Sequence, residues 1–169
     1  MNLILCGMMG SGKTTIGIKI ADKTRLRWYD TDELIVDKHG KISDIFEYYG
    51  EAHFRKLETE IVRELAQKDD LVISSGGGLV LKKENNELLQ KNGKIVFLRA
   101  TPETLAGRLK VDGTRPLLQT SAETLKGRLL RLLQERTPIY EAVADYIVDV
   151  DGKTPEKIAE EIIVMVGVI

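Results

Sequence analysis

The sequence contains a single cysteine, Cys6, so no disulfide bond can form within the chain. Cys6 lies in the apolar run LILCG, where we expect it to be a small core residue. The chain also has no excess of either charge. Its 25 basic and 26 acidic residues give a net charge of −1, which provides no global attraction to nucleic acid or to an anionic membrane. Any basic site must therefore be local.

Long hydrophobic runs are also absent. No apolar stretch approaches the roughly 20 residues that a membrane-spanning helix needs, and no charged leader with an apolar core precedes the first expected strand. There is no fixed-period repeat and no linker rich in Pro, Gly or Ser. The length of 169 residues and the 43% of hydrophobic residues predict one domain, residues 1–169, with a sizeable core. We expect a soluble cytoplasmic monomer, with neither nucleic acid nor a membrane as a partner.

Short apolar runs alternate with helical patterns along the chain, and this alternation is typical of βαβ units with a parallel sheet. The expected strands are residues 3–6, 26–30, 71–74, 94–99 and 146–150. The expected helices are residues 14–23, 51–68, 84–91, 102–110 and 155–166. Thr101 and Thr154 each precede a proline and are expected to be N-caps. The pattern predicts an α/β fold of three layers, a five-stranded parallel sheet flanked by helices.

The strongest motif is GMMGSGKT, residues 7–14, which fits G-x-x-x-x-G-K-[ST] between an apolar strand and a helix. The backbone N–H groups of such a loop point at phosphates, and the helix N-terminus adds a favourable dipole. Lys13 supplies a cation at the β- and γ-phosphates, and Thr14 supplies a hydroxyl ligand for Mg²⁺. The predicted ATP-binding residues of this segment are Gly10, Ser11, Gly12, Lys13, Thr14 and Thr15. Switches, motors and kinases all use such a loop, so other groups must identify the reaction.

Two aspartates, Asp30 and Asp32, lie at the end of the second expected strand in the stretch YDTDE. Because the carboxyl ends of parallel strands open onto the ligand crevice, we interpret Asp30 as the carboxylate on the metal side. Asp32 would then accept a hydrogen bond from a substrate hydroxyl. The alternative is that Asp32 only caps a helix starting near Glu33.

An arginine and a run of three glycines are further candidate site residues. Arg55 and Glu58 lie three residues apart on one helical face, so Glu58 can brace the guanidinium group while it engages an acid. The alternative is an ordinary surface ion pair. Gly76, Gly77 and Gly78 directly follow an expected buried strand, where their missing side chains let a ligand lie against backbone N–H groups. A flexible turn is the competing account of these glycines.

The segments GMMGSGKT, DTD, GEAHFRKLE, SSGGG, GTRPLL and ERTPIY together resemble the shikimate kinase family in their order and spacing. The resemblance covers almost the whole chain. It implies a P-loop NTPase fold similar to that of nucleoside monophosphate kinases, with a substrate-binding segment at about residues 31–60 and a mobile lid at about residues 110–120. It also implies transfer of the γ-phosphoryl group of ATP to the 3-hydroxyl of shikimate, on the route to chorismate and the aromatic amino acids.

The resemblance also assigns roles to residues. Thr14 and Asp30 are assigned to magnesium binding, with Asp30 acting through water. The shikimate contacts that it implies are Asp32, Arg55, Gly77, Gly78 and Arg136. The patterns described above add Glu58 and Gly76 to the predicted substrate-binding residues. Arg115, in GTRPLL, becomes the lid arginine over the phosphates, and it shares the catalytic role with Lys13 and Asp32. The family's arginine near adenine has no counterpart in DVDGKTPEK, where Lys153 or backbone is expected to replace it.

Three other functions share some of these features. A gluconate-type kinase also has a P-loop and an acidic acceptor site, but the glycine run together with FRKLE favours shikimate. A GTPase switch is a second possibility, because DKHG, residues 37–40, fits the D-x-x-G motif of GTPases. However, the sequence contains no N-K-x-D motif, which recognises guanine. A regulatory module that binds without catalysis is the third possibility, but every expected catalytic position is filled.

Overall fold

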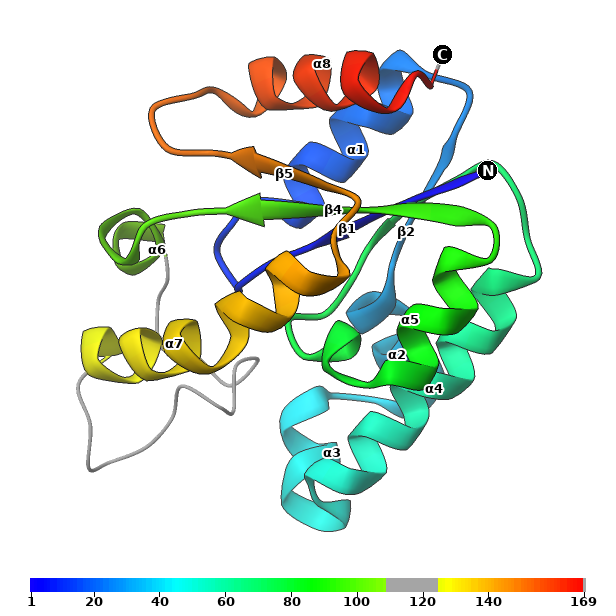
Figure 1. Cartoon of the computed structure of the whole chain (residues 1–169). Coiled ribbons are helices and arrows are strands. Elements are labelled where there is room, and N and C mark those ends of the chain that lie inside the picture. The colour runs from blue at the N-terminus through cyan, green and yellow to red at the C-terminus, as the bar shows by residue number, and fades with distance from the viewer. Residues whose placement is uncertain (109–124, 169) are drawn as a thin grey trace.

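The structure, a computed structural model, describes residues 1–108 and 125–168, and five parallel strands form one sheet (Figure 1). The strands are β1 (Asn2–Cys6), β2 (Arg27–Asp30), β3 (Leu71–Ser74), β4 (Gly93–Arg99) and β5 (Tyr146–Asp149), in the spatial order β2-β3-β1-β4-β5. The expected strands are confirmed, and each boundary differs by at most one residue. Strand β1 is central and wholly buried, which explains its continuous apolar sequence.

Helices cover both faces of the sheet, as the predicted three-layer architecture requires. Figure 1 shows α1 and α8 on one side and α4, α5 and α7 on the other. The helices are α1 (Lys13–Lys23), α2 (Thr31–His39), α3 (Ile42–Tyr49), α4 (Glu51–Ala66), α5 (Lys83–Gln90), α6 (Pro102–Arg108), α7 (Leu125–Val143) and α8 (Pro155–Val166), and a 3₁₀ turn, η1, spans Leu79–Leu81. Within the described ranges, none of these helices is long and apolar enough to cross a membrane.

Alternate side chains of the central strand point into two different cores. Leu3 and Leu5 pack on the side of α1 and α8, whereas Ile4 and Cys6 pack on the opposite side, against residues of α4 and α7. Cys6 is fully buried, and its burial raises the pKa of its thiol to about 12. The expectation that Cys6 is a small core residue is therefore confirmed.

Three helices were not among those expected: α2, α3 and α7. Helix α2 follows β2 directly, with Asp30 as its N-cap; the Asp30 side chain accepts hydrogen bonds from the backbone N–H groups of Asp32 and Glu33. The alternative that Asp32 is the cap of this helix is therefore wrong.

Helix α7 was not expected because it contains Pro138, which lacks a backbone N–H and is unfavourable inside a helix.

The expected N-caps of α8 and α6 are present. Thr154 caps α8, and its side chain accepts a hydrogen bond from the Lys157 N–H across 3.2 Å. The Thr101 hydroxyl accepts from the Thr104 N–H across 3.4 Å at the start of α6. Helix α6 is described as far as Arg108, and the predicted lid at about residues 110–120 lies outside the described residues.

Candidate active site

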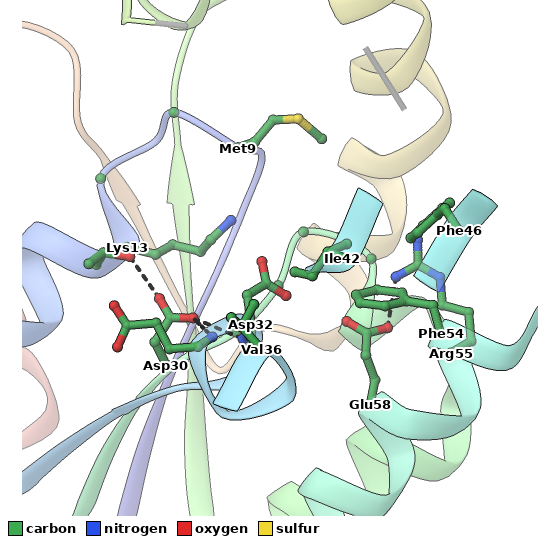
Figure 2. A pocket seen from close by; sticks show the side chains of 18 of the residues that line it. Met9, Lys13, Asp30, Asp32, Val36, Ile42, Phe46, Phe54, Arg55 and Glu58 are labelled. Carbon is green, nitrogen blue, oxygen red and sulfur yellow. Dashed lines mark hydrogen bonds and ion pairs between the residues drawn. The ribbon is translucent and has the colours of Figure 1, made fainter. Parts of the chain in front are cut away.

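A cavity of about 520 Å³ opens at the carboxyl ends of β1, β2 and β3 (Figure 2). It is bounded by the loop after β1, by α2 to α4, by the glycine run after β3 and by α7. The predicted site residues that line it are Gly10, Gly12, Lys13, Thr14, Thr15, Asp30, Asp32, Arg55, Glu58, Gly76, Gly77, Gly78 and Arg136. The nucleotide-binding and acceptor-binding residues expected from the sequence thus share one cavity.

The phosphate loop folds back on its own lysine. The Lys13 ammonium group donates to the carbonyl oxygen of Gly7 and, across 3.2 Å, to that of Met8. Burial lowers the pKa of Lys13 to about 8, although the nearby charge of Asp32 opposes this shift. Ser11 is fully buried within the loop. Lys13 is therefore a weakly solvated cation whose present partners are neutral carbonyl groups, and an anionic phosphate would be a stronger partner.

A hydroxyl and a carboxylate stand together beside this loop. The Thr14 Oγ1 donates to Asp30 Oδ2 across 2.8 Å, while Asp30 Oδ1 is held by the first turn of α2. Oxygen ligands of this kind suit Mg²⁺, which usually takes one or two protein groups together with substrate phosphates and water. In the described part of the chain, no cluster of three or more His, Cys, Asp or Glu residues could hold a metal alone. The pair fits a magnesium ion that the nucleotide helps to bind.

Arg55 and Glu58 form a partly buried ion pair rather than a surface one. Arg55 Nη1 donates to Glu58 Oε1 across 2.7 Å, and the Glu58 side chain is only 1% exposed. Burial raises the pKa of Glu58 to about 7, although the Arg55 charge acts in the opposite direction. A second carboxylate, Glu51, accepts from Arg55 Nη2 across 3.2 Å. The guanidinium group is therefore held by two carboxylates and lines the cavity. The brace expected from Glu58 is present.

Glycines are needed in this run because two side chains approach its backbone closely. A Cβ atom on Gly76 would lie 2.7 Å from Asp32 Oδ1, and one on Gly78 would collide with the Arg55 guanidinium group. The run is anchored as well, since the Gly76 N–H donates to the Thr31 hydroxyl across 2.8 Å. These contacts favour a built binding surface over the alternative of a flexible turn.

A second arginine reaches the same end of the cavity from α7. Arg136 is 5% exposed, and its Nη1 atom has no hydrogen-bond partner among the described residues. The same holds for Glu58 Oε2. Buried polar atoms are normally paired, so these two atoms indicate the place of a polar ligand.

An apolar wall completes this half of the cavity. Figure 2 shows Ile42 and Phe46 of α3 and Phe54 of α4 beside Arg55. The Phe46 and Phe54 ring centroids are 5.0 Å apart, and Arg55 Cζ lies 5.3 Å from the Phe54 ring centroid. The site can therefore accommodate a small molecule with a carboxylate, hydroxyl groups and an apolar face.

Three predicted residues are not among those that line the cavity, and one further cation was missed. Ser11 is buried within the phosphate loop instead. Lys153 pairs with Glu161 across 3.0 Å and does not line the cavity, so its adenine contact stays a prediction. Arg115 lies outside the described residues. Arg108 was not predicted, but its Nη1 donates to the carbonyl oxygen of Gly10 in the phosphate loop across 3.3 Å. The available signal was an arginine at the end of the helix that precedes the expected lid.

Comparison with known proteins identifies the family of this chain. The family model "Shikimate kinase" matches residues 9–166. Shikimate kinases of Caldicellulosiruptor bescii and Thermodesulfovibrio yellowstonii are each 44% identical over 163 residues, covering 96% of this chain and 93% and 92% of theirs. The structure of shikimate kinase from Acinetobacter baumannii in complex with shikimate aligns with a TM-score of 0.92 and 35% identity, covering 98% of this chain and 92% of that one. The chain therefore belongs to the shikimate kinase family.

Proposed function

We propose that this protein transfers the γ-phosphoryl group of ATP to the 3-hydroxyl of shikimate, giving shikimate 3-phosphate and ADP on the route to chorismate and the aromatic amino acids. The observation that carries this proposal is the shared cavity, in which Lys13 and Asp32 face the same space as Arg55 and Arg136. The relatives named above support the choice of acceptor, because one of them was solved in complex with shikimate.

The donor side of the reaction is the phosphate loop. Its N–H groups and Lys13 would bind the β- and γ-phosphates, and the lysine would leave the carbonyl groups of Gly7 and Met8 to do so. Thr14 directly, and Asp30 through water, would hold a magnesium ion. Bound there, magnesium would neutralise charge on the phosphates.

The acceptor side would bind shikimate by its carboxylate and its hydroxyl groups. A guanidinium fork matches a carboxylate in two parallel hydrogen bonds, so Arg55 and Arg136 are the proposed carboxylate contacts. Asp32 would orient the 3-hydroxyl in line with the γ-phosphorus and accept its proton as transfer proceeds. Glu58 keeps Arg55 in place, and the glycine run supplies backbone contacts.

Other features of the proposal concern the surroundings of the site. Arg115 would close over the phosphates from the lid and limit hydrolysis of ATP by water. Arg108 places a further cation beside the phosphate loop, and Lys153 is the proposed contact near adenine. The protein would act as a monomer in the cytoplasm, where ATP is available.

The direct test is a coupled assay of ADP release with purified protein, magnesium, ATP and shikimate. We expect turnover that depends on shikimate and magnesium. Gluconate in place of shikimate should give background rates, and GTP in place of ATP should be a poorer donor. Release of ADP that does not depend on shikimate, or that is faster with gluconate, would contradict the assigned acceptor.

A further inference from the structure

Tyr140 lies behind the candidate active site without lining its cavity. It is fully buried in α7, four residues after Arg136. Side chains four residues apart project from the same face of a helix. Helix α7 therefore places the Arg136 side chain at the cavity and the Tyr140 side chain in the core next to it.

The Tyr140 hydroxyl donates a hydrogen bond to the carbonyl oxygen of Gly77. The hydroxyl also contacts the Met8 sulfur, a weak acceptor, at 4.0 Å, and it interacts with the side chain of Arg136. Burial raises the pKa of Tyr140 to about 12, although the charge of Arg136 opposes this shift. The hydroxyl therefore remains a donor throughout the neutral pH range.

Both partners in this hydrogen bond are held in place. The Tyr140 ring packs against the Phe97 ring of β4, with 5.0 Å between centroids. A Cβ atom on Gly77 would lie 3.2 Å from Arg136 Nη1 and 3.7 Å from the carbonyl oxygen of Gly7. Gly77 is thus the point where the phosphate loop, the glycine run and α7 meet.

We propose that Tyr140 is a positioning residue for the acceptor half of the site, acting through the peptide group between Gly77 and Gly78. A peptide group is planar and trans, so fixing its carbonyl towards Tyr140 turns the Gly78 N–H the opposite way. That orientation keeps the N–H available to a ligand in the cavity that both glycines line. This inference rests on the proposed function, because the ligand concerned is shikimate.

The test is Tyr140→Phe, which keeps the ring and removes only the hydroxyl. We expect the KM for shikimate to rise about tenfold, as for the loss of one buried hydrogen bond, while the KM for ATP stays within about twofold. Tyr146→Phe, in β5, is the matched control for the loss of a tyrosine hydroxyl away from the cavity, and should leave both KM values unchanged.

A purely structural role would give a different result. If Tyr140→Phe lowers Tm but leaves the KM for shikimate unchanged, or raises both KM values equally, the positioning role is overturned. A wild-type protein that does not phosphorylate shikimate would instead overturn the proposed function. Amide hydrogen exchange of residues 75–81 without ligand tests the hold on Gly77 independently: it should be faster in Tyr140→Phe than in the wild type and in Tyr146→Phe, and equal rates would overturn the inference.

Discussion

Arg55 and Glu58 are joined by a hydrogen bond of 2.7 Å within one turn of α4, and the carboxylate partner is almost completely buried. The pair therefore combines a short hydrogen bond with the burial of a carboxylate, which helical spacing alone does not predict. Glu58 restrains the guanidinium group on one side, and its own ionisation is made costly by the apolar surroundings. One ion pair thus links the proposed acceptor contact to the stability of the fold, and the two effects can be measured separately.

The stability of the protein should depend on the ionisation of Glu58. Its pKa is about 7 in the folded protein and near 4.5 in the unfolded chain, so the folded state binds a proton more tightly between these values. The contribution of Glu58 is therefore favourable below pH 4.5 to 5 and is lost as the pH rises through 7. The free energy of unfolding of the wild type relative to Glu58→Gln should fall by roughly 2 to 3 kcal/mol between pH 5 and pH 8.

Urea denaturation of both proteins at several pH values measures this difference. Glu60→Gln on the exposed face of the same helix is the control and should show no such trend. A constant difference between the wild type and Glu58→Gln from pH 5 to pH 8 would show that Glu58 titrates like a solvated carboxylate.

Arg55→Lys should weaken acceptor binding, because a lysine cannot form the two parallel hydrogen bonds of a guanidinium fork. We expect the KM for shikimate to rise about tenfold with a smaller change in kcat. Arg63→Lys is a matched control, since Arg63 lies on the same helix but is 57% exposed and pairs with Glu84. Steady-state kinetics with saturating ATP give both values. A KM equal to that of the wild type would remove Arg55 from the acceptor site.

Asp32→Asn should reduce kcat by about 100-fold, because the amide can neither orient the hydroxyl in the same way nor accept its proton. Nucleotide binding should be nearly unchanged, since the phosphate loop is untouched. Asp44→Asn, in the first turn of α3 and outside the cavity lining, is the control for the loss of one negative charge. Calorimetric titration with ADP and steady-state turnover together make the measurement. Turnover within a few-fold of the wild type would leave Asp32 with no catalytic role.

Much of the fold could be predicted because the signals were local. The strands are short apolar runs, and the P-loop motif predicts both the loop after β1 and the start of α1. Helix α7 was hidden by Pro138, whose effect on the helix is offset by the burial of Leu129, Leu132 and Tyr140, a tertiary effect that no local pattern contains. A helix near Glu33 was considered only as an alternative role for Asp32, because its actual cap, Asp30, was interpreted as a metal ligand.

The site could be predicted where one motif supplies several groups, as in the phosphate loop and in the pair of Arg55 and Glu58. Contacts between segments that are distant in the sequence were harder to predict. Arg108 reaches Gly10 across 98 positions of sequence, and the hydrogen bond from Tyr140 to Gly77 spans 63. Such pairs depend on how α6 and α7 pack against the sheet, which the sequence determines only through the whole fold.

The affinity for ATP should depend on pH through Lys13. Burial holds the pKa of Lys13 at about 8 in the free protein, below the value of 10.5 for a solvated lysine. Binding to phosphates requires the charged form, so a neutral lysine must take up a proton when ATP binds. The Kd for ATP should therefore rise about tenfold per pH unit above pH 8, because each unit of pKa difference costs about 1.4 kcal/mol.

Calorimetry between pH 7 and pH 9.5, in buffers of different ionisation enthalpy, measures both the Kd and the proton uptake. Lys13→Arg keeps its charge over this range, so its affinity for ATP, although weaker, should not depend on pH in the same way. A wild-type Kd that stays constant up to pH 9.5 without proton uptake would mean that Lys13 remains charged in the free loop. In that case, its contacts with the carbonyl groups of Gly7 and Met8 would offset the cost of burial.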